Sequence, residues 1–197
     1  FMIFLLKKII NFRIFFKKPI QKKILVYDRL SLKFAKALFG SNNLSVYDVR
    51  YESVNLAILI KSILKNGLRF IKKNYKFEYF KSVNPKIIYT SIDNNLGFYK
   101  LKTMFPNALY IADQNGVRDN KFYNECINFY KNFSKQQLKT DLFFCFGNNE
   151  KNRLKKIIKG NIIPLGNSLN NKLKIKKENK KIKKIIFISG GSNDKIL

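Results

Sequence analysis

Carboxylates are the side chains that could do acid–base chemistry in this sequence, because its 197 residues include no histidine. Asp28, Asp93 and Asp113 each follow a short apolar run that reads as a strand. Such a carboxylate could take a proton from a ligand hydroxyl, or it could only cap the next helix, a role that suits Asp93 best. Without histidine, the Ser-His and Cys-His nucleophile systems are excluded. Cys126 and Cys145 are isolated and make no zinc motif or disulfide framework, so we expect no metal and no cofactor.

The stretch Asn107–Gly116 joins an apolar run to a polar turn. Residues 108–112 are almost wholly apolar, which is typical of a buried central strand in a parallel sheet. Gln114 and Asn115 then offer amide groups suited to ligand hydroxyls, and Gly116 permits positive φ and close approach of a ligand. The alternative is a plain strand-to-helix turn in which Asn115 and Gly116 serve only the backbone.

Other polar residues near predicted strand ends are candidates for ligand binding. Arg50 and Glu52 could form an ion pair, or Arg50 could bind a diphosphate through its two-pronged guanidinium. Ser53 and Asn94 complete this group. A late glycine-rich turn could cradle a donor phosphate with backbone N–H groups, although a purely structural turn is the alternative and the sequence lacks both dinucleotide-binding and P-loop motifs. That turn consists of Ser189, Gly190, Gly191 and Ser192.

Short apolar runs alternate along the chain with segments of helical periodicity. The runs predict strands over residues 24–27, 44–49, 86–92, 108–112, 141–146 and 161–165. The periodic segments predict helices over residues 30–39, 54–65, 69–83, 95–105, 120–138 and 149–159. We expect Ser53 to cap the second helix, Asp93 and Asn94 the fourth, and Gly67 to end the second in a left-handed cap.

This alternation predicts an α/β fold, a Rossmann-like three-layer sandwich with a mainly parallel sheet. The carboxyl ends of its strands share one edge, and a topological switch point at that edge forms a ligand crevice. We therefore expect Asp28, Asp93 and Asp113 to converge there. Within the sequence we interpret residues 1–22 as a basic, apolar leader helix, 23–168 as the Rossmann-like domain, 169–183 as a basic linker and 184–197 as the first strand and turn of a truncated second domain.

The composition describes a folded and very basic protein, with 46% hydrophobic residues and a formal charge of +28. We do not expect nucleic acid as a partner, because the lysines are spread through every predicted helix and accompany abundant Ile, Asn and Phe, as AT-rich coding would give. An anionic membrane surface is the stronger candidate. The leader could lie in the plane of a membrane or pack on the domain, and we expect a cytoplasmic protein held peripherally on the inner face of the cytoplasmic membrane.

Several of these turns together resemble one protein family. They are Tyr27-Asp28-Arg29, the block Tyr47-Asp48-Val49-Arg50-Tyr51-Glu52-Ser53-Val54-Asn55-Leu56, Asp93-Asn94-Asn95, Gln114-Asn115-Gly116 and Leu165-Gly166-Asn167-Ser168. The chain resembles the surface carbohydrate (surface polysaccharide) biosynthesis proteins of bacteria, which look like two-domain glycosyltransferases of the GT-B type. The most specific part is the block that begins at Tyr47.

The resemblance implies a protein that transfers a sugar from a nucleotide-sugar donor to a glycan or lipid-linked acceptor. Residues 23–168 would be the N-terminal, acceptor-side half of the GT-B architecture, with Asp28, Asp93 or Asp113 as base. In such enzymes the second domain holds most of the nucleotide-sugar site, so we expect the 197-residue chain to be a fragment that is inactive alone. A different class of function stays open, a non-catalytic α/β domain that binds a nucleotide or phosphorylated ligand for regulation. A third is a phospho-sugar or polyol-phosphate transferase of the same build.

Overall fold

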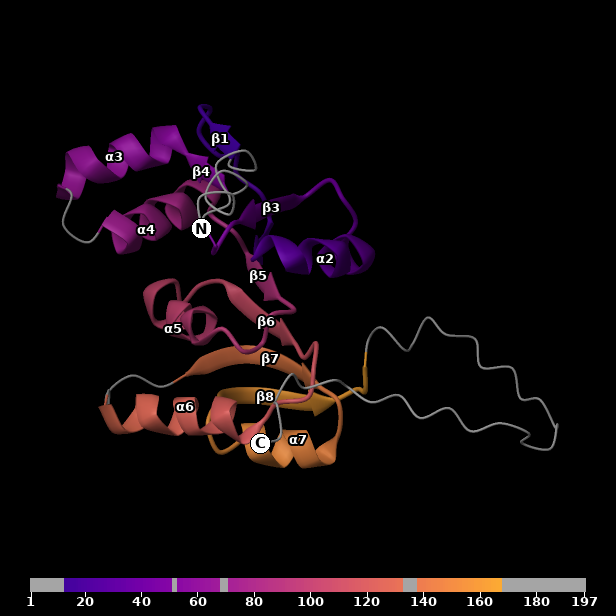
Figure 1. Cartoon of the computed structure of the whole chain (residues 1–197). Coiled ribbons are helices and arrows are strands. Elements are labelled where there is room, and N and C mark those ends of the chain that lie inside the picture. Colours follow the sequence, from indigo (N-terminus) through magenta and orange to yellow (C-terminus); the bar gives the residue numbers. More distant parts are fainter. Residues whose placement is uncertain (1–12, 51–52, 68–70, 133–137, 168–197) are drawn as a thin grey trace, which may run out of the picture.

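One six-stranded sheet forms the centre of the molecule (Figure 1). The computed structural model describes residues 13–50, 53–67, 71–132 and 138–167. The strand order is β3-β2-β5-β6-β7-β8, and all neighbours are parallel. The bounds are β2 Ile24–Tyr27, β3 Leu44–Tyr47, β5 Ile87–Thr90, β6 Leu109–Asp113, β7 Lys139–Cys145 and β8 Lys159–Pro164. The predicted α/β class and mainly parallel sheet are confirmed.

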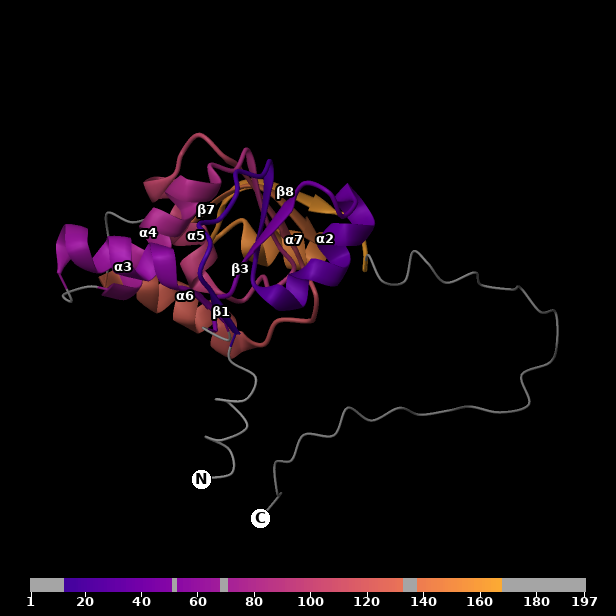
Figure 2. The ribbon, with the colours of Figure 1, turned by 90° about the horizontal axis from the view of Figure 1, so that it is seen from above.

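Helices lie on both faces of this sheet and complete a Rossmann-like three-layer sandwich (Figure 2). One face carries α3 Leu56–Asn66, α4 Ile71–Val83, α5 Leu96–Met104 and α6 Asn120–Asn132. The other carries α2 Leu32–Phe39, which follows a 3-10 turn at Arg29–Ser31. A short helix, α7 Asn148–Leu154, connects β7 to β8. Because both faces are covered, interior strands such as β2 are buried throughout, which explains their apolar runs.

Aromatic rings dominate the larger of the two hydrophobic cores. Tyr27 of β2 stacks on Tyr47 of β3 with ring centroids 5.9 Å apart. Phe80 of α4 lies edge-on to Tyr47 at 5.3 Å, and Phe98 of α5 lies 5.6 Å from Tyr27. These contacts fix the carboxyl ends of β2 and β3 against α4 and α5. The smaller core joins Ala35 of α2 to the opposite face of the sheet.

A parallel two-stranded ribbon was missed by the sequence analysis. In it β1 Arg13–Phe15 pairs with β4 Ser53–Asn55. The prediction of a leader helix over residues 1–22 is therefore wrong for 13–15, which are extended, and residues 16–22 form no helix. Pairing with β4 supplies hydrogen-bond partners for the backbone N–H and C=O groups that a helix would have paired internally. Residues 1–12, the predicted linker 169–183 and the predicted strand and turn of 184–197 lie outside the described residues.

Asparagines, and not the predicted residues, cap two of the helices. Asn55 accepts the N–H of Ile58 at the start of α3, whereas Ser53 lies in β4. Asn95 accepts the N–H of Gly97 at the start of α5, in place of Asp93 or Asn94. Each helix begins one or two residues later than predicted, because a later side chain reaches the free N–H groups. Gly67 ends α3 with a positive φ of 66°.

The order of the strands places the topological switch point between β2 and β5. From β2 the chain moves to β3 on one side, then returns through α3 and α4 to β5 on the other side. From β5 it advances steadily to β8. The crevice of such a fold lies beyond the carboxyl ends of the two strands at the switch. The predicted central strand β6 is an interior strand but lies one position away from this point.

A buried carboxylate joins α3 to α4. Glu78 of α4 is 1% exposed, and its two oxygens contact Lys61 at 2.6 Å and Lys65 at 3.0 Å, both on α3. The hydrogen bond to Lys61 is the main cause of a pKa lowered from the ordinary 4.5 of Glu78, and it outweighs the opposing effect of burial. The ionised form of Glu78 therefore stabilises this helical hairpin.

Replacing Glu78 by Gln should lower the free energy of unfolding at neutral pH by about 2 kcal/mol, because its ion pairs with Lys61 and Lys65 are lost. The folded pKa of Glu78 lies below the unfolded one, so its contribution is full above about pH 4.5 and is lost as pH falls through the lowered value. Urea unfolding at neutral and acidic pH should show this difference shrinking in acid. Glu125→Gln, on the exposed face of α6, is the matched control. Equal effects of the two changes at neutral pH would contradict the role of Glu78.

Candidate functional site

Two ion pairs cross between the loops that follow β2 and β3. Arg29, after β2, donates its Nε and Nη2 to Asp48 Oδ2 at 3.0 and 2.8 Å. In the opposite direction, Arg50 of the loop after β3 forms an ion pair with Asp28 of the loop after β2, with its Nε 3.4 Å from Asp28 Oδ2. Each loop therefore gives one carboxylate and one guanidinium to the other. The expected pair of Arg50 with Glu52 is not described, because Glu52 lies outside the described residues.

The backbone of Asp28 is held in an uncommon conformation. Its φ is 86°, and among the described residues only Asn84 shares a positive φ without being glycine. Asp28 Oδ1 accepts the N–H of Leu30, and the Asp28 side chain is only 5% exposed. Such a conformation costs roughly 1–3 kcal/mol and persists where surrounding contacts enforce it, which is common at functional sites. Here the Leu30 cap and the Arg50 pair supply those contacts.

Buried hydroxyl groups tie the two strands of the switch point together beneath this loop. Ser31 Oγ accepts the backbone N–H of Ser91 at 2.8 Å and lies 3.1 Å from Ser91 Oγ. Thr90 Oγ1 donates to the carbonyl of Tyr27 at 3.1 Å. The loop after β2 is therefore fixed to the end of β5, and the crevice between them has a rigid floor.

The switch point opens into a cavity of about 440 Å³. Asp28 and Arg50 form one wall, and the amino end of α5 forms the other, where Gly97 has no side chain. A Cβ atom on Gly97 would lie 3.0 Å from the hydroxyl of Tyr27 and 2.9 Å from Asn95 Oδ1, so a larger residue there would displace the side chain that caps α5. The lining residues are Asp28, Val49, Arg50, Ile92, Asn94, Asn95, Leu96, Gly97 and Glu125.

The other two predicted carboxylates do not line this cavity. Asp93 is fully buried and holds Arg118 through both oxygens, with Arg118 Nε 2.7 Å from Asp93 Oδ2. Burial is the largest influence on the pKa of Asp93 and raises it above its ordinary value, although Arg118 opposes the shift. Asp113, the last residue of β6, accepts the hydroxyl of Tyr89 at 3.4 Å. Of the three carboxylates expected to converge on the crevice, only Asp28 lines this cavity, and Asp93 and Asp113 are bound to partners of their own.

The amide of Gln114 is used inside the protein. Its Oε1 accepts the N–H of Phe146 at 2.9 Å, and its Nε2 contacts the carbonyl of Gly116 at 3.0 Å and Glu150 at 3.3 Å. Asn115 is exposed, and its Oδ1 accepts a hydrogen bond from Arg118 Nη2. Gly116 does not have the positive φ that was expected, and an added Cβ atom would approach nothing closer than 3.8 Å. This turn holds β6 to β7 through the side chain of Gln114, and Gly116 adopts no left-handed backbone conformation.

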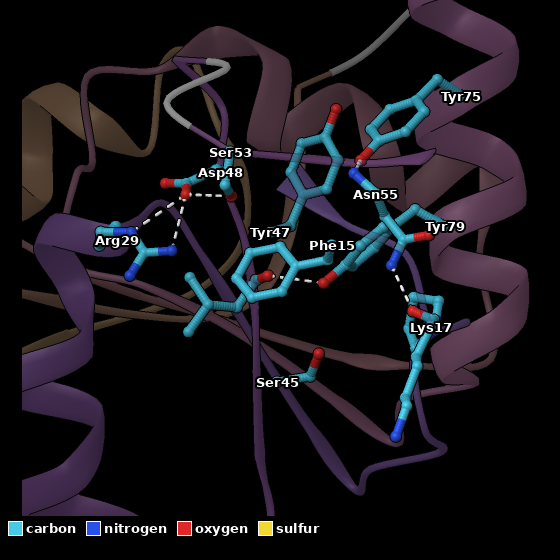
Figure 3. Close-up of a pocket in the computed structure, with 12 residues that line it drawn as sticks. Phe15, Lys17, Arg29, Ser45, Tyr47, Asp48, Ser53, Asn55, Tyr75 and Tyr79 are labelled. Atoms are coloured by element: carbon cyan, nitrogen blue, oxygen red, sulfur yellow. Dashed lines mark hydrogen bonds and ion pairs between the residues drawn. The ribbon is translucent and has the colours of Figure 1, made fainter. Parts of the chain in front are cut away.

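A second cavity, of about 320 Å³, lies beside β3 and was not predicted (Figure 3). Arg29 and Asp48 stand on one side, with Ser53 donating its hydroxyl to Asp48 at 2.5 Å. Tyr75 and Tyr79 of α4 stand on the other. A sequence signal for both cavities exists, since β2 and β3 both end in a tyrosine followed by an aspartate, and an arginine comes one or two residues after the aspartate. The pairing between the two loops could not be read from either alone.

No protein-family model, curated protein or solved structure matches this chain. In the described ranges, no three His, Cys, Asp or Glu side chains gather in a way that could hold a metal ion. No helix of those ranges is long and apolar enough to cross a bilayer. The predicted phosphate turn of Ser189, Gly190, Gly191 and Ser192 lies beyond the described residues.

Replacing Gln114 by Ala should cost about 2 kcal/mol of unfolding free energy, because the part-buried N–H of Phe146 and the buried carboxylate of Glu150 each lose a partner. Asn115→Ala is the matched control at the adjacent, exposed position and should change stability by less than about 0.5 kcal/mol. Chemical unfolding of both variants measures the difference. A cost of Asn115→Ala equal to that of Gln114→Ala would contradict the structural role of Gln114.

Proposed function

We propose that this chain is the acceptor-binding domain of a glycosyltransferase of bacterial surface polysaccharide biosynthesis. A nucleotide-sugar would be the donor, a glycan or lipid-linked sugar the acceptor, and no metal or cofactor would be needed. Support comes from the family resemblance of the turns and from the α/β sheet with a cavity at its switch point. The observation that carries the proposal is the pairing of Asp28 with Arg50 in the wall of that cavity.

A carboxylate and a guanidinium side by side suit a sugar diphosphate. Arg50 is 53% exposed at its side chain and uses Nε toward Asp28, so its terminal nitrogens can turn to a diphosphate. Asp28 would then be the base for an acceptor hydroxyl, and Asn94, at the mouth of the same cavity, would contact the sugar. Asp93, Asp113 and Gln114 are bound to groups inside the protein, so in this proposal they support the structure and do not contact the ligand.

A second candidate function has an observation in its favour. Asp28 Oδ1 caps Leu30 and its Oδ2 pairs with Arg50, so both oxygens already have partners. A site with one available guanidinium beside the amino end of a helix binds phosphate well without any base. A non-catalytic domain that binds a nucleotide or phosphorylated ligand would use this cavity in that way.

The two functions predict different ligands for the same cavity. A soluble, short-alkyl N-acetylhexosamine diphosphate should bind the chain more tightly than UDP or GDP do if the cavity receives a lipid-linked acceptor. Arg50→Gln should weaken this binding about tenfold, because a charge-assisted pair of hydrogen bonds is lost. Isothermal titration calorimetry measures both comparisons.

Arg13→Gln is the control for charge, because it removes one positive charge from an exposed position of β1 and should leave affinity nearly unchanged. Tighter binding of the nucleoside diphosphates would favour the regulatory alternative. Binding of neither ligand, or equal losses in the Arg50 and Arg13 variants, would contradict the site itself.

We also propose that the protein works on the cytoplasmic face of an anionic membrane, where lipid-linked acceptors are found. Besides the formal charge of +28, the support is an exposed segment after β1. Phe16 and Ile20 are 70% and 76% exposed there, and Lys17 and Lys18 lie between them. Apolar side chains flanked by lysines are the combination that binds anionic bilayer surfaces.

Flotation with phosphatidylglycerol vesicles should fall as salt is raised, because each lysine near the surface contributes about 1 kcal/mol that salt screens. Replacing Phe16 and Ile20 together by Ser should lower flotation further. Leu64→Ser is the control, since Leu64 is 81% exposed on α3 and the nearby Lys61 and Lys65 are paired with Glu78. Equal flotation with neutral vesicles at high salt would contradict the electrostatic proposal, and equal loss in the control would contradict the segment.

A further inference from the structure

The cavity beside β3 is separate from the crevice at the switch point. The two share no lining residue. Figure 3 shows Arg29, Asp48 and Ser53 along one side, Tyr75, Tyr79, Asn55 and Lys17 along the other, and Phe15 and Tyr47 between them. The β1–β4 ribbon pairs Phe15 with Asn55 here, although the two residues are far apart in the sequence. A volume of about 320 Å³ is at the small end for ligand pockets and suits one ring, not a whole nucleotide-sugar.

Asp48 is a lining residue of this cavity with an incompletely used carboxylate. Its side chain is 4% exposed, and three hydrogen bonds, two from Arg29 and one from Ser53, all reach Oδ2. From the part of the chain that the structure describes, no donor reaches Oδ1. The free oxygen of a nearly buried carboxylate gains from a ligand that brings hydroxyl or N–H donors. Because Arg29 already neutralises Asp48, the ligand need not carry a charge.

The remaining walls are aromatic and held in place. Tyr79 donates its hydroxyl to the carbonyl of Val46 at 2.7 Å, and the hydroxyl of Tyr75 accepts the N–H of Asn55 at 2.8 Å. Asn55 in turn donates from Nδ2 to the carbonyl of Lys17 at 2.7 Å, which holds the segment after β1 over the cavity. Phe15 is half-exposed. Walls fixed by their own hydrogen bonds lose little entropy when a ligand binds.

From this combination we infer that the cavity beside β3 binds a single neutral pyranose ring. The hydroxyl groups of the sugar donate to Asp48 Oδ1, and the weakly polar C–H face of the ring packs on Phe15, whose electron-rich face attracts it. Ser53 Oγ, already a donor to Asp48, accepts from a neighbouring hydroxyl. This site does not depend on the diphosphate crevice, because Arg29 and Asp48 belong to the other of the two crossed ion pairs.

Saturation-transfer NMR and titration of the full chain with methyl glycosides of common hexopyranoses test this inference. At least one glycoside should bind saturably, and Phe15→Ala should weaken it about fivefold. Phe16→Ala is the matched control, since Phe16 is the next residue, is more exposed and does not line the cavity. Asp48→Asn should weaken binding as well, with a thermal melt to verify that the variant is folded.

Each other outcome overturns the sugar site. One is the absence of saturable binding for every glycoside. Another is an equal loss for Phe15→Ala and Phe16→Ala, which would mean surface adsorption. Preferential binding of free nucleosides would mean that the aromatic walls accept a base and not a sugar. Arg50→Gln separates this proposal from the previous one, because it should weaken the sugar diphosphate while methyl glycosides bind as before.

Discussion

The crossed ion pairs between the loops after β2 and β3 are the interaction on which both cavities depend. Arg29 with Asp48 forms a wall of the cavity beside β3, and Arg50 with Asp28 forms a wall of the switch-point crevice. Breaking either pair would leave a buried carboxylate without its counter-charge, which is costly in an apolar surrounding. The stacked rings of Tyr27 and Tyr47, one residue before each aspartate, keep the two loops at the spacing that this pairing needs.

Acidic residues are scarce in this basic chain, and the fold uses many of them as internal anchors. Asp93 holds Arg118, Glu78 holds two lysines of α3, and Asp141 accepts both Lys102 and the N–H of Tyr110. Each anchor joins elements that the sequence separates. The surplus of positive charge is consequently left for the surface, where water and salt screen it. This division lets a chain of formal charge +28 keep an ordinary α/β interior.

The sequence predicted the sheet well because the signal was local. Runs such as Ile24–Tyr27 are apolar at every position, which only a doubly covered strand requires. The strand order, which places the switch point at β2 and β5, depends on contacts between distant segments. No local sequence pattern could therefore predict it. The same is true of the site, since Asp93 reads as a helix cap until Arg118, 25 residues later, is seen to hold it. The β1–β4 ribbon was missed because three-residue strands are too short for periodicity to show.

Tyrosine takes the place of tryptophan throughout this molecule, which has ten of the former and none of the latter. Burial raises the pKa values of Tyr89, Tyr99 and Tyr110 well above the ordinary 10. An unfolded chain would release those protons near pH 10 while the folded one keeps them, so the fold loses stability as pH rises above that value. The near-ultraviolet spectrum of the protein is therefore a report on its interior. Phenolate absorbance that develops slowly in alkali would follow the opening of the core itself.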